Sequence, residues 1–472
     1  MNLSVSGWIT LVRMASLELK NKRVLVVGAG KSGISAARFL RERGAKVTIS
    51  DSRSAAALAG EIPALMDAGI MVEAGGHGLL TFRRQDLIVV SPGVPMDTPE
   101  VKQVVALGMP VIGELELASR FLQGQVIAIT GSNGKTTTTT LVGEILKRGE
   151  VPTLVGGNIG LPVIELVAES RPETWSVLEV SSFQLETVVD FRPRIAAVLN
   201  ITPDHLDRHK TFASYAAAKA RITERQDAED FLVLNGENKD AQMVAAHAGP
   251  LGRTRAQIFW FSDRRPIKQG TFVHGESVVY LPKEGGRAEP VMPVSEIRLK
   301  GAHNVENVLA AVTIARLAGV SSEEIRAAVG KFKAVEHRLE LVRVRNGVEF
   351  YNDSKATNVD AAMKAVAAFA GGVHLILGGK DKDSDYKRMA DLLKERVRVV
   401  YLIGSAAEKI RGELGGVVKM VEAGTLDVAV AEAAKSAVSG DVVLLAPACS
   451  SFDQFENYEH RGRVFRELVA AL

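Results

Sequence analysis

Short apolar runs alternate with stretches of helical periodicity along most of the chain. After the first run, Ile34, Ala37, Phe39 and Leu40 follow at the spacing of a helix that covers a sheet with its apolar face. Polar residues stand at the ends of these runs, and strands that alternate with helices in this way predict α/β sheets. The runs expected to form strands are 22–27, 46–50, 86–90, 126–129, 175–180, 194–199, 231–235, 348–353, 373–377, 399–403 and 442–445, with a small β excursion at 258–261 and 277–281.

The chain has 472 residues, a length that favours about three domains. We expect these domains at 14–113, 114–334 and 335–472, with a hinge near 336–338. Residues 1–13 are expected to form a disordered or frayed extension, because the apolar stretch within them lacks a basic leader.

Composition narrows the class of protein. Charged residues make up 24% and apolar residues 46%, which is typical of a globular domain in water. The formal net charge is only +3 and no basic block is present, so a nucleic-acid partner is not expected. Cys449 is the single cysteine, which excludes an internal disulfide and fits a reducing compartment. No apolar run approaches the roughly 18 residues of a membrane span. We therefore predict a cytoplasmic protein.

A glycine motif follows the first apolar run. Gly28, Gly30 and Gly33 have the Gly-x-Gly-x-x-Gly spacing, and Asp51 ends the next strand about 20 positions later. The motif predicts a nucleotide-binding crevice for a dinucleotide or, alternatively, a nucleoside diphosphate; glycines used only for close strand–helix packing are the third possibility. Ser91 and Gly93 follow the strand at 86–90 and are expected to face the same crevice.

A second glycine motif lies at 131–137, between the apolar run at 126–129 and a helical pattern. Strand, tight turn and helix form the context in which Gly-Lys-Thr binds phosphate: the turn and the helix N-terminus present N–H groups, Lys135 adds a cation, and the Thr136 hydroxyl can hold Mg²⁺. The first glycine is Gly131 instead of position 129, so an ordinary turn stays possible on this motif alone.

Two strand ends further along carry candidate metal ligands. Glu179 lies near the end of the strand at 175–180, where it is suited to Mg²⁺ but is equally well explained as a solvated strand-end carboxylate. His205 and His209 lie in a polar segment that Pro203 favours as a loop. With no cysteine nearby we disfavour zinc, and we expect His205 beside a Mg²⁺–phosphate site and His209 in solvent.

Three other positions leave alternatives open. Lys219 lies in a helical stretch, 212–222, and the residues alone favour a surface position; turned inward beside a metal, it could react with CO₂ to give an anionic carbamate. Asn304 and Asn307 lie one turn apart on a helix and could bind an adenine edge. Cys449 has no histidine placed to activate it, so an inert, partly buried thiol is favoured over a nucleophile.

Three longer motifs, taken together, resemble those of the Mur ligase family, the ATP-dependent amide ligases of peptidoglycan precursor synthesis. They are Thr-Gly-Ser-Asn-Gly-Lys-Thr at 130–136, Asp-Ser-Lys-Ala-Thr-Asn at 353–358 and Pro-Ala-Cys-Ser-Ser-Phe-Asp-Gln-Phe at 447–455. The last two resemble the D-glutamate-adding members. The likeness covers essentially 20–472. It implies an N-terminal Rossmann-like domain for a UDP-sugar, a central P-loop-type ATPase and a C-terminal Rossmann-like domain that delivers the amino acid.

The resemblance also implies ligands: ATP, Mg²⁺, UDP-N-acetylmuramoyl-L-alanine and D-glutamate, bound by a monomer. The implied catalytic residues are Lys135, Glu179, His205 and Lys219, of which the last three, with Thr136, would hold the metal, Lys219 as a carbamate. The implied ATP contacts are Gly131, Ser132, Asn133, Gly134, Lys135, Thr136, Thr137, Thr138, Asn304, Asn307, Arg338, Asp353 and Lys355. The implied UDP-substrate contacts are Gly30, Ser32, Asp51, Ser91, Gly93 and Asn158. The implied D-glutamate contacts are Thr357, Lys382, Ser451 and Tyr458. Phe452 and Tyr458 depart from the commonest family pattern, which bears on the shape of the amino-acid pocket.

Two other functions compete with this interpretation. The first glycine motif with Asp51 would suit an NAD-dependent oxidoreductase, but that function leaves the Lys135 loop and Glu179 without a task. A P-loop switch protein that regulates a partner is the second, and it would hydrolyse ATP without any small amine.

Overall fold

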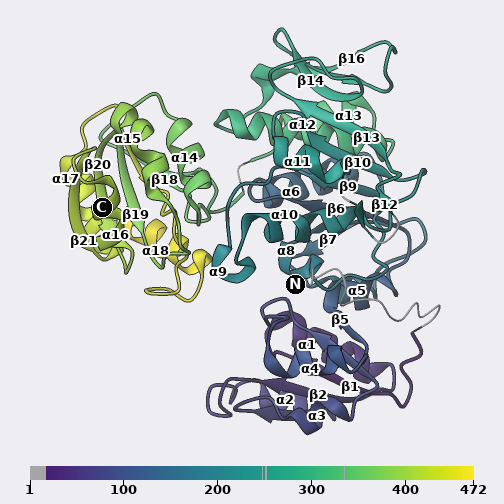
Figure 1. Cartoon of the computed structure of the whole chain (residues 1–472). Helices are drawn as coiled ribbons and strands as arrows, with labels where there is room; N and C mark the ends of the chain where they lie inside the picture. Colours follow the sequence, from purple (N-terminus) through teal and green to yellow (C-terminus); the bar gives the residue numbers. More distant parts are fainter. Residues whose placement is uncertain (1–16, 247, 250–251, 334) are drawn as a thin grey trace.

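The computed structural model describes residues 17–246, 248–249, 252–333 and 335–472. Three main sheets, each with its own helices, follow one another along the chain and form three units (Figure 1). The arrangement confirms the three-part α/β fold predicted from the strand pattern. The predicted extension at 1–13 lies outside the described residues, and the exact boundaries between the domains stay a prediction.

The first sheet has five parallel strands in the order β3-β2-β1-β4-β5. The order reverses beside β1, which places the carboxyl ends of β1 and β4 next to each other at the switch point where such sheets bind ligands. The strands are β1 (Arg23–Val27), β2 (Lys46–Asp51), β3 (Met71–Ala74), β4 (Leu87–Val90) and β5 (Val111–Gly113), and the helices are α1 (Lys31–Glu42), α2 (Ile62–Asp67), α3 (Leu79–Arg83) and α4 (Pro99–Ala106).

The central sheet has nine strands in the order β16-β15-β14-β13-β10-β9-β6-β8-β7. β6 lies between β8 and β9, so the turn after it is surrounded by other strand ends. The strands are β6 (Gln125–Thr130), β7 (Thr153–Gly157), β8 (Trp175–Glu179), β9 (Ile195–Val198), β10 (Phe231–Asn235), β13 (Gln257–Ser262), β14 (Gly270–His274), β15 (Ser277–Leu281) and β16 (Glu289–Pro293). A two-stranded hairpin, β11 (Ala248–Gly249) and β12 (Gly252–Arg253), stands apart.

The helices of this unit vary widely in length. α6 and α12 are the long ones and pack against each other over the sheet. The helices are α5 (Glu114–Ser119), α6 (Lys135–Arg148), α7 (Val163–Leu166), α8 (Ser182–Leu185), α9 (Leu206–His209), α10 (Phe212–Ala220), α11 (Lys239–Met243), α12 (Ala302–Leu317) and α13 (Ser322–Val329).

The third sheet has six strands in the order β17-β18-β22-β19-β20-β21, parallel except for the β17–β18 pair. Its strands are β17 (Glu340–Arg345), β18 (Val348–Asn352), β19 (Val373–Gly378), β20 (Val397–Ile403), β21 (Lys419–Gly424) and β22 (Val442–Leu445). Its helices are α14 (Val359–Ala367), α15 (Ala390–Arg396), α16 (Ala407–Leu414), α17 (Leu426–Ser436) and α18 (Tyr458–Ala471).

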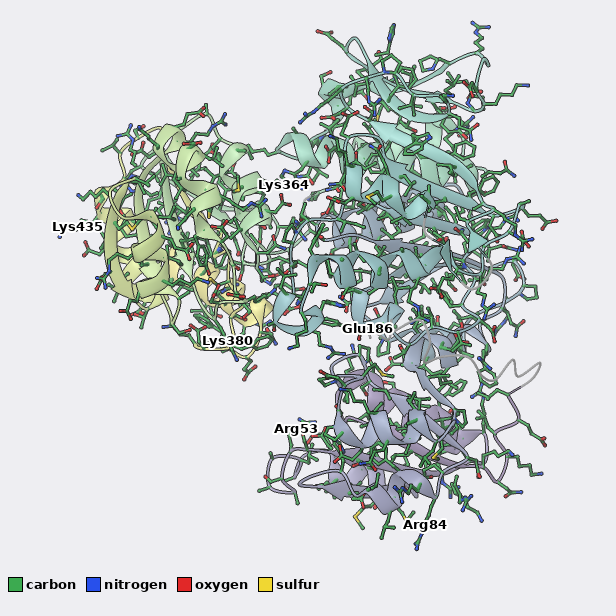
Figure 2. All side chains as sticks on the ribbon, viewed as in Figure 1. Arg53, Arg84, Glu186, Lys364, Lys380 and Lys435 are labelled. Carbon is green, nitrogen blue, oxygen red and sulfur yellow. The ribbon has the colours of Figure 1, made fainter. Side chains whose placement is uncertain are left out.

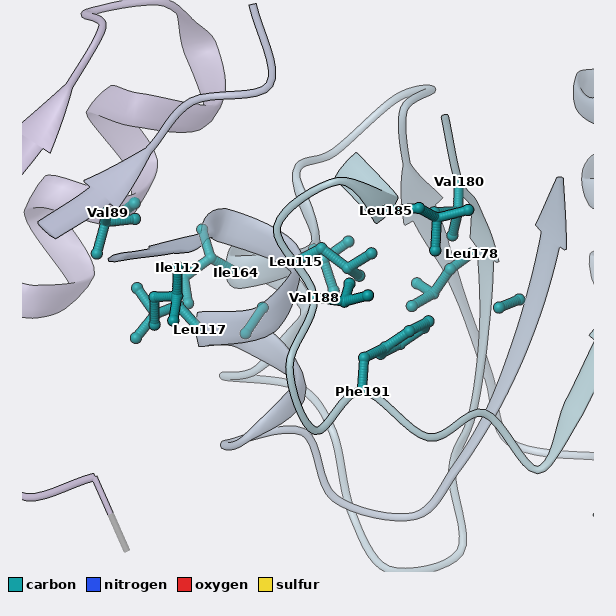
Figure 3. Packing of buried hydrophobic residues seen from close by; sticks show 14 of the residues in the cluster. Val89, Ile112, Leu115, Leu117, Ile164, Leu178, Val180, Leu185, Val188 and Phe191 are labelled. Carbon is teal, nitrogen blue, oxygen red and sulfur yellow. The ribbon is translucent and has the colours of Figure 1, made fainter. Parts of the chain in front are cut away.

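One buried apolar cluster continues from the first unit into the second. It includes Val89 of β4, Ile112 of β5, Leu117 of α5 and Ile164 of α7 (Figure 3). Because side chains of both units share one core, the connection between them is packed as a protein interior and is not a loose linker.

The β excursion expected at 258–261 and 277–281 belongs to the main sheet. β13 pairs in parallel with β10, and β14, β15 and β16 extend the sheet beyond it. Among the residues that the structure describes, no helix is both long and apolar enough to cross a membrane.

Candidate functional site

The turn between β6 and α6 is shaped by two glycines with positive φ, Gly131 at 155° and Gly134 at 86°. A Cβ atom on Gly134 would lie 2.2 Å from Asn307 Oδ1, so a larger residue would displace that side chain, and the positive φ itself favours glycine. Lys135 folds back over the turn and donates from Nζ to the carbonyls of Gly131 and Ser132 at 2.9 and 3.0 Å. Desolvation lowers its pKa.

Further side chains brace this turn. Asn200, which follows β9, accepts the Asn133 N–H at 2.8 Å, and Ser132 donates to the Thr202 carbonyl at 2.8 Å. The hydroxyls of Thr137 and Thr138 are buried and have no hydrogen-bond partner among the described residues. Asn200 was not identified from the sequence as a site residue, although its place directly after a buried strand was a usable signal.

Glu179, at the end of β8, lies directly beside the turn. Its Oε2 accepts the Thr136 hydroxyl at 2.8 Å, and its Oε1 accepts Asn158 Nδ2 at 3.0 Å. The side chain of Glu179 is buried, which excludes the solvated strand-end alternative. Lys355 of the third unit donates from Nζ to Thr136 Oγ1 at 2.6 Å, so the third unit reaches the turn with a cation. Burial lowers the pKa of Lys355 to about 8.

Lys219 points inward from α10. It is 1% exposed, and its Nζ donates to the Gly131 carbonyl at 2.9 Å and to Thr130 Oγ1 at 3.4 Å. The surface position favoured by the residues alone is therefore wrong, and the inward position implied by the family resemblance is correct. Helix propensity could not decide between the two, because it does not say which face of α10 is covered by the turn after β6.

A short helix, α9, forms where a loop was expected; His205 precedes it and His209 is its last residue. His205 precedes the helix with a left-handed backbone, φ 54°, and burial lowers its pKa to about 4. The prediction that His209 lies in solvent is wrong. Its ring stacks on Phe183 at 5.4 Å between centroids, and its Nε2 lies 2.9 Å from Ser182 Oγ. Phe183 and Ser182 belong to α8, which the sequence did not reveal as a partner of this segment.

A pocket opens beside the turn, between the second and third units. Asn304 and Asn307 lie on one face of α12 as predicted, and Asn307 Nδ2 donates to Asn304 Oδ1 at 3.1 Å. Burial raises the pKa of Asp353 to about 6. Within the part of the chain that the structure describes, Asp353 Oδ1 and Arg338 Nε are buried without a hydrogen-bond partner. The pocket is lined by Asn133, Gly134, Asn200, His303, Glu306, Asn307, Arg338, Asp353, Ala361 and Lys364.

The glycine crevice of the first unit is built from strand ends. Gly28 has φ 96°, and a Cβ atom on Gly33 would lie 1.9 Å from the Gly28 carbonyl oxygen, so Gly33 is required for the close approach of α1 to β1. Gly30 and Ser32 stand at the start of α1, and Gly30 has open space around it. Ser91 Oγ donates to the Gly28 carbonyl at 2.9 Å.

Asp51 closes the other side of this crevice. It accepts the Ala29 N–H at 2.7 Å and pairs with Arg53 at 3.0 Å. Burial alone would raise the pKa of Asp51, but the hydrogen bonds from Arg53 and Ala29 lower it to about 2. Gly93 follows β4 and is exposed.

The glycine loop at 156–160 connects the two crevices. Gly156 and Gly157 end strand β7, and the loop proper begins at Asn158. Lys31 of the first glycine turn donates to the Gly160 carbonyl at 2.6 Å, while Asn158 reaches Glu179. The loop is therefore in contact with both nucleotide-type sites.

The third unit presents its candidate residues across from the turn. Lys382 Nζ lies 3.3 Å from Asp204 Oδ1, and Asn358 Nδ2 donates to Asp204 Oδ2 at 2.8 Å. These cations and amides lower the pKa of Asp204 against the effect of its burial. Thr357 precedes Asn358, and an isolated bridge between Lys380 and Ser450 brings the loop of Lys382 beside that of Ser451. Asp204 was not predicted from the sequence as a site residue.

Tyr458 and Phe452, the two departures from the family pattern, differ in position. Tyr458 begins α18 and lies under Lys355, whose Nζ is 4.9 Å from the ring centroid. Phe452 is 68% exposed. Cys449 is fully buried and hydrogen-bonded to Tyr386 OH at 2.9 Å, and burial raises its pKa to about 12. The thiol is more deeply buried than expected, and its raised pKa disfavours the thiolate that a nucleophile needs.

Comparisons with known proteins agree with this geometry. The MurD-like N-terminal domain of Mur ligases matches residues 22–113, the Mur ligase middle domain matches 129–315, and the Mur ligase glutamate ligase domain matches 337–449. The UDP-N-acetylmuramoylalanine--D-glutamate ligase of Acidobacterium capsulatum is 64% identical over 96% of this chain and 97% of its own length. The protein of the same name from Koribacter versatilis is 58% identical over 96% and 98%.

Solved structures share the fold. The UDP-N-acetylmuramate-alanine ligase MurC of Thermotoga maritima superposes with a TM-score of 0.59 at 18% identity, over 96% of this chain and all of that one. MurF ligase from Thermotoga maritima, in complex with ADP, gives 0.56 at 17% identity, over 96% and 97%. Three family models along the chain and near-full-length relatives of this identity lead to one conclusion: the chain belongs to the Mur ligase family.

Proposed function

We propose that this protein joins D-glutamate to UDP-N-acetylmuramoyl-L-alanine, with ATP converted to ADP and phosphate. The names of the most similar relatives support this choice of substrates. The observation that carries it is the meeting of the second and third units at one turn: Lys135 and Thr136 belong to the turn, Glu179 and Asn158 lie beside it, and Lys355 of the third unit donates to Thr136. The first unit reaches the loop of Asn158 through Lys31, which donates to the Gly160 carbonyl.

ATP fits the pocket between the second and third units. Its phosphates would lie on the N–H groups of the 131–137 turn, where the start of α6 and Lys135 offer positive charge. Its adenine would lie toward Asn304 and Asn307, whose amides offer both donors and acceptors. The unpaired buried atoms of Asp353 and Arg338 in this pocket are polar groups that a bound ligand could satisfy.

Mg²⁺ fits the pair formed by Thr136 and Glu179. The Glu179 carboxylate and the Thr136 hydroxyl are hard oxygen ligands 2.8 Å apart, and the low pKa of His205 keeps its ring neutral and able to bind a metal. Lys219 does not fit as an ammonium, but a carbamate on its amine would supply a second anion. Bound there, Mg²⁺ would stabilise negative charge on phosphate oxygens.

The reaction itself is the condensation of a carboxylate with an amine. A carboxylate is a poor electrophile in water, so the γ-phosphoryl group of ATP is first transferred to it, giving an acyl phosphate. The amine of D-glutamate then attacks the carbonyl carbon of the acyl phosphate, and phosphate leaves from the resulting tetrahedral intermediate. Both steps gather negative charge on oxygen, and Lys135 with the N–H groups of the turn is positioned to stabilise it.

The UDP-substrate is assigned to the first unit, where Gly30, Ser32, Asp51, Ser91 and Gly93 surround the crevice. Lys31 and the 158–160 loop provide a route from this crevice to Glu179.

D-Glutamate is assigned to the third unit. Lys382 offers a cation, and Thr357, Ser451 and Tyr458 offer hydroxyls to its two carboxylates. In the structure Lys382 is paired with Asp204, which D-glutamate would have to replace as its partner. The contacts that bring this unit onto the turn would also exclude water from the acyl phosphate.

Product formation across a set of amines tests this proposal. With ATP and UDP-N-acetylmuramoyl-L-alanine present, D-glutamate should give an amide, whereas L-alanine and diaminopimelate should give none. The Lys135→Ala variant should stay folded and lose at least about 10³-fold in rate, because charge on the phosphates would go unopposed. ATP hydrolysis at a rate independent of D-glutamate would favour the alternative of a P-loop switch protein. Binding of NAD(H) would favour the alternative of an NAD-dependent oxidoreductase.

The proposal also includes that the protein is a monomer and acts in the cytoplasm. The free thiol of Cys449, buried beside Tyr386, is compatible with a reducing compartment.

A further inference from the structure

Arg208 connects α9 of the central unit to the turn that follows β4 in the first unit. Its Nη2 donates to the Val94 carbonyl at 3.0 Å, and its Nη1 donates to the Gly93 carbonyl at 3.5 Å. These carbonyls belong to the 91–94 turn, which begins at Ser91 beside the glycine crevice. The contact therefore crosses from the unit that carries His205 to the unit that carries the crevice.

The guanidinium is itself held by two residues of the α8 segment. Arg208 Nη2 also donates to Glu186 Oε2 at 3.0 Å, and the central guanidinium carbon, Cζ, lies 4.9 Å from the Phe183 ring centroid. The side chains of Arg208 and Glu186 are 16% and 21% exposed, so the pair is largely shielded from water. Glu186 lies on the side of the central unit that faces the first unit (Figure 2). A rigid, planar fork held on several sides fixes its acceptors more firmly than a lysine would.

The same segment continues to His205 through packed rings. Phe183 makes an edge contact with His205 at 4.9 Å between centroids and stacks on His209 at 5.4 Å. His209 Nδ1 in turn lies 3.3 Å from Glu186 Oε1. A contiguous set of side chains thus runs from the 91–94 turn to His205, which the proposed function assigns to the metal site.

We infer that Arg208 is a positioning residue for ligation. It holds the 91–94 turn against α9 and thereby sets the distance between the bound UDP-substrate and the γ-phosphate of ATP. The inference rests on the proposed function and adds to it a residue that touches neither reactant. Group transfer is sensitive to such placement, because a shift of about 1 Å can cost about 10²-fold in rate.

Two substitutions of Arg208 test the inference. Arg208→Gln removes the charge and the fork, whereas Arg208→Lys keeps the charge but cannot span both carbonyls and Glu186. Arg326→Gln is the control, because Arg326 of α13 also pairs with a glutamate, Glu296, but among the described residues it forms no hydrogen bond or ion pair with the first unit. For each protein, the measurements are the dissociation constants of UDP-N-acetylmuramoyl-L-alanine and of a non-hydrolysable ATP analogue, the kcat of amide formation and the unfolding temperature.

For Arg208→Gln we expect binding of the UDP-substrate to weaken about tenfold and kcat to fall about 10²-fold, while ATP-analogue binding and the unfolding temperature stay at wild-type values. The UDP-substrate affinity and the kcat of Arg208→Lys should lie between those of Arg208→Gln and the wild type. Arg326→Gln should match the wild type in every measurement. This split between the two ligands distinguishes positioning from a purely structural role, which would weaken both together.

A wild-type kcat and wild-type dissociation constants in Arg208→Gln would overturn the inference. Equal weakening of the binding of both ligands, together with a lower unfolding temperature, would overturn it too. A wild-type protein that bound the UDP-substrate but formed no amide would refute the proposed function instead. The ratio of the two dissociation constants in Arg208→Gln would still decide the inference, because binding does not require turnover.

Discussion

At the scale of single residues, Lys219 shows the sharpest conflict between charge and surroundings. It is fully buried, and its Nζ is bonded to a carbonyl and a hydroxyl instead of a carboxylate. Burial, together with the charge of Lys135, lowers its pKa well below the usual value for lysine. An amine that gives up its proton easily is the form that adds CO₂, and the carbamate would exchange an ill-placed cation for an anion beside Glu179.

Replacing Lys219 tests this role. Lys219→Ala should lower kcat by about 10²-fold or more, because the site would lose an anion that stabilises the metal and the phosphates. Added formate or acetate should restore part of the rate by filling the space with a carboxylate. Lys210→Ala, at an exposed lysine on the same segment, should be indistinguishable from the wild type. Full activity of Lys219→Ala without added carboxylate would end the carbamate proposal.

How well single residues were predicted depended on how local their partners are. Lys135 and Thr136 are placed by the turn that contains them, so their position could be read from the sequence. His209 and Asp204 are placed by α8 and by the third unit, which are distant in sequence. Nothing in a single sequence states such pairings, so His209 was wrongly predicted to be solvated and Asp204 was not singled out.

At the scale of elements, the first glycine turn is governed by one close approach. A Cβ atom on Gly33 would lie 1.9 Å from the Gly28 carbonyl oxygen and 2.6 Å from Ser91 Oγ, whereas one on Gly30 would meet nothing within 4 Å. The first contact is to backbone, which cannot move aside without separating α1 from β1.

The two glycines therefore form a matched pair for substitution. Gly33→Ala should lower the free energy of unfolding by about 1 to 3 kcal/mol through overpacking. Gly30→Ala should leave it within about 0.5 kcal/mol of the wild type, measured by urea denaturation. Equal stability of the two variants would show that the close approach of α1 to β1 is not required.

Central strands were predicted well and edge strands poorly. β1, β4, β6, β8, β9 and β10 are buried on both faces, so each appears in the sequence as a continuous apolar run. β3, β17 and β21 lie at sheet edges and are partly exposed, and their mixed sequences carried no such signal. The β excursion was predicted, but its attachment to β10 depends on pairing between strands and not on the sequence of either strand.

At the scale of the whole molecule, the short helix α5 joins the first two units. Glu116 accepts the backbone N–H groups of Val189, Asp190 and Phe191, the first at 2.7 Å, and pairs with Arg120 at 2.8 Å. Glu114 accepts the Ile164 N–H at 2.7 Å, but its second oxygen is buried and has no hydrogen-bond partner in the described ranges of the chain. Burial raises the pKa of Glu114 to about 7.

This raised pKa makes the stability of the junction depend on pH. The folded state binds the proton more tightly than the unfolded state, so the contribution of Glu114 is fully present below about pH 4.5 and is lost as pH rises through 7. Glu114→Gln should therefore be more stable than the wild type by about 2 to 3 kcal/mol at pH 8, with the difference shrinking toward zero near pH 4.5. Glu144→Gln, at an exposed glutamate on α6, serves as control. Parallel stability–pH curves for Glu114→Gln and wild type would contradict the assignment.

The three units together support one chemical claim, that the γ-phosphoryl group of ATP is transferred to the carboxylate of the UDP-substrate at the turn that carries Lys135. Supplying UDP-N-acetylmuramoyl-L-alanine with ¹⁸O in its carboxylate, together with ATP and D-glutamate, tests this claim most directly. We predict that the released inorganic phosphate carries one ¹⁸O atom from the substrate, because the bond broken in amide formation is the one between the acyl carbon and that oxygen. Phosphate released without ¹⁸O during amide formation would contradict the account.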